Sequence, residues 1–118
     1  MMTPTIFREE SFRRARQNET DVSYDMARLA LYALGLTGEA GEVADEIKKV
    51  IFHDKPLDAT KIVNECGDVL WYLDRMLFAV GATMEQAMEA NTTKLAKRYP
   101  DGFDDAERKY GFTIKEGA

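Results

Sequence analysis

Two pairs of acidic residues stand at helical spacing in this chain, Glu39 with Glu42 and Glu65 with Asp68. Residues three apart on a helix lie side by side, with Cβ atoms about 5–6 Å apart, so each pair predicts a small anionic patch. Two such patches facing each other would form a site for hard divalent cations such as Mg²⁺, which take oxygen ligands. Glu46 lies along the same helix flank as Glu39 and Glu42 and adds a further carboxylate. Beside a phosphate-binding side chain, this arrangement predicts phosphoryl chemistry.

A polar and basic face follows later in the chain, where Asn91, Lys94 and Arg98 are spaced by three and four residues. Lysine and arginine hold phosphate, and asparagine can contact a base or a sugar. The alternative is an ordinary basic helix end, which the helix dipole favours. Tyr72 follows Asp68 by one helical turn and is predicted to point into the same space.

Glutamates at helical spacing are most often a solvated face, and this alternative has to be weighed. Against it, the acidic residues border apolar stripes, and four glycines lie near them: Gly35, Gly38, Gly41 and Gly67. A glycine inside a helix costs about 1 kcal/mol relative to alanine. The glycines therefore predict close approach of another backbone or room for a ligand; tight helix packing alone remains open.

The elements that must position these residues are all helical, because period-2 alternation is nearly absent. We expect one all-α domain over residues 1–118, with a core over about 24–99 and an irregular tail over 100–118. Asp58 is a good N-cap, Gly81 a good helix terminator, and Thr83 with Gln86 resembles a capping box. The predicted helices span about 6–18, 24–51, 58–80 and 83–98.

Each of the two central helices carries an acidic edge beside an apolar stripe. The stripe of the second helix comprises Leu29, Leu36, Ala40, Val43, Ile47 and Ile51; that of the third comprises Ile62, Cys66, Val69, Leu73, Met76 and Val80. Antiparallel packing of the two stripes is predicted to bring the acidic edges together. Trp71 and Phe78 fall on the other side of the third helix, where a second subunit is predicted to cover them in preference to the tail.

Composition narrows the function classes. The net charge of −5 argues against binding of nucleic acid or an anionic membrane surface. No apolar run approaches the ~20 residues needed to span a bilayer. The single cysteine, Cys66, cannot form an internal disulfide, which together with the absence of a signal sequence predicts a cytoplasmic protein. Cys66 is predicted to be inert, and His53 to be incidental.

Three segments, GLTGEAGEVADEIKK, NECGDVLWYL and NTTKLAKRYPDGF, resemble the MazG-type all-α nucleoside triphosphate pyrophosphohydrolases. The resemblance covers roughly Ala30 to Phe103, including the Glu-x-x-Glu and Glu-x-x-Asp pairs separated by 22 residues. It implies a four-helix bundle-like fold assembled as a homodimer or a dimer of dimers. It also implies Mg²⁺-dependent hydrolysis of a nucleoside or deoxynucleoside triphosphate to the monophosphate and pyrophosphate, with Mn²⁺ as a substitute metal.

The resemblance also implies residue roles. The metal ligands would be Glu39, Glu42, Glu65 and Asp68, and a metal-activated water would attack the α-phosphorus. Catalytic carboxylates would be Glu39, Glu42 and Glu46, with Glu42 or Glu46 as the base. Substrate contacts would come from Lys94 and Arg98 to phosphate and from Asn91 and Tyr72 to sugar or base.

Two other function classes are open to test. A redox di-metal bundle needs Glu-x-x-His pairs, and the only histidine, His53, has Val50 three residues before it. A non-catalytic helical interaction module would use the apolar helix faces to bind partners. Trp71 is expected to serve the core or an interface and not to stack on a base.

Overall fold

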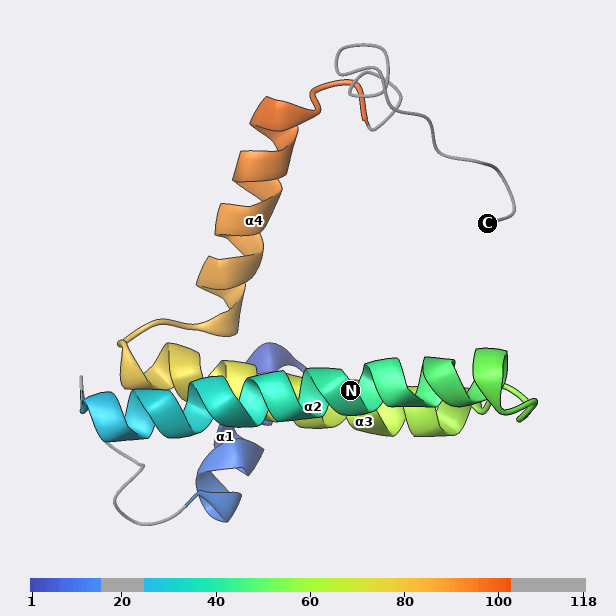
Figure 1. Ribbon diagram of the computed structural model, residues 1–118. Coiled ribbons are helices and arrows are strands. Elements are labelled where there is room, and N and C mark those ends of the chain that lie inside the picture. The colour runs from blue at the N-terminus through green and yellow to red at the C-terminus, as the bar shows by residue number, and fades with distance from the viewer. Residues whose placement is uncertain (16–24, 103–118) are drawn as a thin grey trace. The chain divides into compact units, whose positions relative to one another are not determined.

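The computed structural model describes residues 1–15 and 25–102, and every regular element within them is a helix. The helices are α1 (Pro4–Arg14), α2 (Met26–Phe52), α3 (Ala59–Ala79) and α4 (Met84–Arg98) (Figure 1). The predicted all-α class is therefore confirmed. The chain divides into two compact units, Met1–Met84 and Glu85–Ala118, and each is described by itself. The single-domain organisation stays a prediction.

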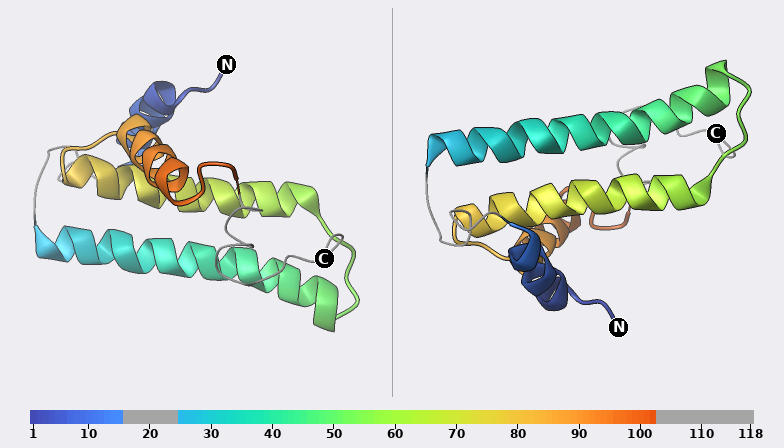
Figure 2. Two further views of the ribbon diagram at one scale, coloured as in Figure 1. Left: turned by 90° about the horizontal axis from the view of Figure 1, so that it is seen from above. Right: turned by 90° about the horizontal axis from the view of Figure 1, so that it is seen from below.

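Helices α2 and α3 form an antiparallel hairpin that is the centre of the first unit (Figure 2). Its ends are fixed by capping residues, which satisfy the otherwise unpaired amides of a helix start. Asp25 accepts a hydrogen bond from the Ala27 amide at 3.0 Å, and Asp58 accepts one from the Lys61 amide at 3.2 Å. Gly81 has a φ of 79°, a left-handed value that glycine adopts freely, and α3 ends before it as predicted.

Helix α1 is shorter and earlier than predicted. It begins at Pro4 because proline suits the first helical position and Thr3 caps the helix, accepting from the Ile6 amide at 3.1 Å. It ends at Arg14 because Ala15 is extended, with φ −72° and ψ 152°. The predicted range of 6–18 is therefore wrong at both ends. Residues 16–24 and the tail from residue 103 lie outside the described residues.

Helix α1 packs on α3 and covers the side that the sequence assigned to a second subunit. The rings of Phe12 and Phe78 meet edge to face with centroids 4.6 Å apart. Arg8 Nε donates to Asp74 Oδ1 at 2.8 Å, and Ser11 Oγ donates to Asp74 Oδ2 at 2.8 Å. The prediction for this side was wrong because its partner lies more than 60 residues earlier in the chain, beyond the reach of helical periodicity.

Two charged residues, Asp74 and Arg75, are fully buried in this contact. Burying a charge is costly unless it is paired. Asp74 takes its bonds from α1, while the Arg75 guanidinium lies 4.6 Å from the Phe12 ring centroid and 5.1 Å from that of Phe78. Cations over aromatic faces are stabilised by the ring quadrupole. Sequence reasoning missed this cluster.

The predicted core stripes of α2 and α3 are only partly buried. Ile47 is 41% exposed, Ile51 64% and Val80 36%, and Ala40 and Cys66 are also exposed. These five assignments to the core were wrong for the single chain, because each helix of a two-helix hairpin covers only part of the other's apolar stripe. No helix in the described part of the chain has the length and apolar character needed to cross a bilayer.

Candidate metal and phosphate site

Three carboxylates converge where the acidic edges of α2 and α3 meet. Glu39 on α2 and Glu65 and Asp68 on α3 each place one oxygen so that all three atoms lie within 4.8 Å of one another. Glu39 and Glu65 are half-buried, and Asp68 is exposed. Antiparallel packing thus brings the two edges together as predicted. We call these three residues the acidic cluster.

The electrostatics of the acidic cluster fit a bound cation. The pKa of Glu39 is raised above its ordinary value, first by partial burial and then by the negative charges of Asp68, Glu65 and Glu42. Both causes disfavour the ionised carboxylate. A divalent cation would remove this penalty, and a set of carboxylate oxygens is the donor set that Mg²⁺ prefers.

The other two predicted acids differ from the acidic cluster. Glu42 is exposed and is not one of the three converging carboxylates, although its charge reaches Glu39. Glu46 is engaged by its own helix, since Lys49 Nζ donates to Glu46 Oε1 at 3.2 Å. Sequence reasoning missed Lys49, although its spacing of three from Glu46 is the signal of an ion pair on a helix. The metal role of Glu42 and the catalytic role of either residue stay predictions.

Tyr72 lies against α2 one turn from the acidic cluster. A Cβ added to Gly35 would overlap the Tyr72 ring, so Gly35 is the glycine that close packing requires. Gly35 precedes Glu39 by four residues and Tyr72 follows Asp68 by four, so both are one helical turn from a cluster member. The ring of Tyr72 also meets that of Trp71 edge to face, with centroids 5.2 Å apart.

The remaining glycines near the acidic residues face open space. An added Cβ would meet no atom within 4 Å at Gly38, Gly41 or Gly67. Helix packing among residues 1–15 and 25–102 therefore does not explain these three glycines. Their place beside the acidic cluster is compatible with the predicted room for a ligand.

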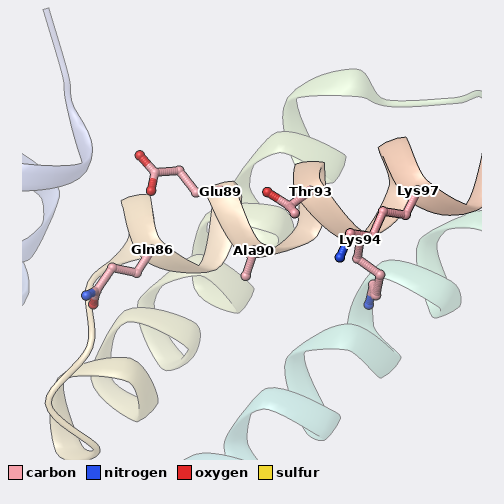
Figure 3. A pocket seen from close by; sticks show the side chains of 6 residues that line it. All are labelled: Gln86, Glu89, Ala90, Thr93, Lys94 and Lys97. Carbon is pink, nitrogen blue, oxygen red and sulfur yellow. The ribbon is translucent and has the colours of Figure 1, made fainter. Parts of the chain in front are cut away.

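The predicted substrate residues Asn91, Lys94 and Arg98 lie on α4 and are all exposed. A hollow of about 560 Å³ runs along this helix, and Lys94 is the only one of the three that lines it. Figure 3 shows the side chains that line it: Gln86, Glu89, Ala90, Thr93, Lys94 and Lys97. Because α4 belongs to the second unit, the approach of these residues to the acidic cluster stays a prediction.

Comparison with known proteins identifies the family. The MazG nucleotide pyrophosphohydrolase domain matches residues 28–103, which is more than half of the chain and includes the acidic cluster. The chain therefore belongs to the MazG nucleotide pyrophosphohydrolase family, and the resemblance drawn from its motifs is confirmed. It is also similar to the Gene 37 protein of Mycobacterium phage L5, with 32% identity over 79 residues, or 63% of this chain and 68% of the phage protein. No solved structure matches the chain.

Proposed function

We propose that this protein is an Mg²⁺-dependent pyrophosphohydrolase that converts a nucleoside or deoxynucleoside triphosphate to the monophosphate and pyrophosphate. The observation that carries the proposal is the convergence of Glu39, Glu65 and Asp68 in a chain of this family. A solvated acidic face would spread its charges apart, whereas these carboxylates converge, and partial burial together with the neighbouring negative charges raises the pKa of Glu39.

Glu39, Glu65 and Asp68, joined by the neighbouring Glu42, would hold the metal. Bound Mg²⁺ would supply charge neutralisation for the triphosphate oxygens and would make water more acidic. The chain's own contribution is to fix these carboxylates on two packed helices, so that no large rearrangement is needed before the substrate binds.

Glu42 is the better of the two proposed bases. Its carboxylate is exposed beside Glu39, whereas the carboxylate of Glu46 already accepts a hydrogen bond from Lys49. Glu42 would accept the proton of the water that attacks the α-phosphorus. The bond between the α-phosphorus and the bridging oxygen to the β-phosphate then breaks, and pyrophosphate leaves.

The substrate would be oriented by residues outside the acidic cluster. Lys94 and Arg98 would pair with phosphate oxygens, for which ammonium and guanidinium groups are suited. Asn91 and Tyr72 would contact the sugar or base. Tyr72 has the stronger support, since its place one turn from the acidic cluster is set by contact with Gly35.

We also propose that the hairpin pairs with a second copy of this chain. Large apolar side chains remain exposed along α2 and α3, among them Leu34 at 74%, Phe52 at 75% and Val63 at 68%. The hairpin of a second copy presents the same apolar face. A two-fold symmetric dimer would therefore bury the exposed apolar side chains of both copies in one interface. Light scattering coupled to size exclusion gives the mass; a monomer at micromolar concentration would contradict pairing.

The function is tested by incubating the protein with a panel of nucleoside and deoxynucleoside triphosphates and Mg²⁺. Pyrophosphate and the monophosphate are the expected products from at least one member. Loss of turnover in Asp68→Asn, with the helical circular dichroism retained, is expected. A folded protein that turns over no member would leave the interaction module as the better explanation.

A further inference from the structure

A cavity of about 200 Å³ lies at the closed end of the hairpin, where α2 leads into α3. Three lysines, Lys49, Lys55 and Lys61, line it together with the carboxylates of Glu46 and Asp58. We call it the lysine cavity. Neither the sequence motifs nor the family match assigns a role to these lysines.

The loop between the helices folds back so that Lys55 joins the cavity. Asp54 has a φ of 53°, in the left-handed region that aspartate tolerates better than most residues. The chain reverses there, and the Lys55 amide donates to the Lys49 carbonyl at 3.3 Å. This contact holds Lys55 at the C-terminal end of α2.

The side chains that line the lysine cavity carry three positive charges and two negative ones. Glu46 is engaged with Lys49 Nζ at 3.2 Å, and Asp58 accepts from the first turn of α3 at 3.2 Å. The ammonium groups of Lys55 and Lys61 form no ion pair with any residue in 1–15 or 25–102. The lining therefore carries a net charge of about +1, and neither Lys55 nor Lys61 is held in an ion pair with another described residue.

The lysine cavity is close to the acidic cluster along both helices. Lys61 precedes Glu65 by one helical turn, a rise of about 6 Å, and Glu46 follows Glu39 by seven residues, a rise of about 10 Å. The α2–α3 pair therefore presents an anionic site and, one to two turns away, a cationic one. A small and highly charged anion released at the acidic cluster would therefore encounter the lysine cavity nearby.

We propose that the lysine cavity binds inorganic pyrophosphate through Lys55 and Lys61, beside the acidic cluster. The identification of pyrophosphate as the natural ligand rests on the proposed function, which releases it one to two turns away. Pyrophosphate matches the site because several phosphate oxygens can accept hydrogen bonds from two ammonium groups at once. Each lysine lacks a described carboxylate partner, so binding breaks no ion pair.

Equilibrium titration of the full chain with inorganic pyrophosphate tests the proposal without turnover. EDTA is present throughout, so that metal pyrophosphate cannot form at the acidic cluster. The test variant is Lys55→Gln with Lys61→Gln, and the matched control is Arg13→Gln with Lys48→Gln, which removes the same charge from exposed residues outside the cavity. Circular dichroism checks that both variants are folded.

Wild type and control should bind pyrophosphate with similar affinity, and the test variant should bind at least about tenfold more weakly, as expected for losing charge-assisted bonds. Equal binding by all three proteins, or no binding to wild type at millimolar pyrophosphate, overturns the site. Equal affinity for sulfate overturns the assignment to pyrophosphate. Asp68→Asn should retain pyrophosphate binding in EDTA while losing turnover. Binding and turnover are measured separately, so the lysine cavity and the proposed function can be refuted independently.

Discussion

Replacing Glu39 by glutamine distinguishes two roles for this carboxylate, as a metal ligand or as a residue that only stabilises the fold. The substitution keeps the size of the side chain and removes one negative charge from the acidic cluster. In wild type the Glu39 oxygen lies within 4.8 Å of oxygens from Glu65 and Asp68. If Glu39 serves only the fold, its replacement should lower the stability of the protein. If Glu39 is repelled by the neighbouring carboxylates, its replacement should raise the stability of the metal-free protein.

The size of the effect follows from Coulomb's law. At 4.8 Å, one pair of like charges repels by ~0.9 kcal/mol in water, and a Debye length of ~8 Å at physiological salt reduces this by roughly half. Two such neighbours then disfavour the ionised Glu39 by about 1 kcal/mol. Glu39→Gln should therefore stabilise the metal-free protein by about 1 kcal/mol, or roughly 4 °C in Tm for a chain of this length.

The assay is thermal unfolding of wild type and variant in EDTA and in millimolar Mg²⁺. In EDTA the variant should melt higher. In Mg²⁺ the wild type should gain stability, because a ligand that binds only the folded state stabilises it, and the variant should gain much less. Glu9→Gln on the exposed face of α1 is the charge-matched control and should respond to Mg²⁺ as wild type does. A variant that melts lower in EDTA and gains from Mg²⁺ as much as wild type would refute the reasoning.

Three further predictions concern the same unit. The pKa of Glu39 is raised from its ordinary value of 4.5. The stabilising effect of Glu39→Gln should therefore be near zero below pH 4.5 and should grow as the pH rises through the raised pKa. Urea unfolding at a series of pH values measures this effect, and a difference in stability that does not change with pH would contradict the assignment. Gly38→Ala, which meets no neighbour, should stabilise the metal-free protein by up to about 1 kcal/mol, whereas Gly35→Ala should cost about 1–3 kcal/mol through overlap with Tyr72; equal effects in chemical denaturation would show that Gly35 is not required for packing. Arg8→Ala should cost about 1–3 kcal/mol because it removes the nearest cation from buried Asp74 and leaves only Ser11 and the more distant Arg75; a denaturation midpoint unchanged from wild type would show that α1 does not hold α3.

The sequence predicted what depends on neighbouring residues. Asp58 and Gly81 mark the ends of α3 because capping and a left-handed φ are local requirements. The convergence of Glu39 with Glu65 and Asp68 was also predictable, since two amphipathic helices that pack their apolar stripes must bring the flanking edges together.

The contact between α1 and α3 was not predictable in this way. The burial of Asp74 depends on Arg8 and Ser11, which lie 66 and 63 residues away, and no helical period links them. The exposure of Ile47 and Ile51 had a related cause. An apolar stripe shows that a side chain seeks burial, but it does not show which element, or which copy of the chain, supplies the cover.

The central claim is that water attacks the α-phosphorus of a nucleoside triphosphate at the acidic cluster, and hydrolysis in ¹⁸O-labelled water with Mg²⁺ tests it most directly. Mass spectrometry of the products should find the label in the nucleoside monophosphate and none in pyrophosphate, with no labelled product from Asp68→Asn. Label in pyrophosphate or orthophosphate, or full activity in Asp68→Asn, would contradict the account.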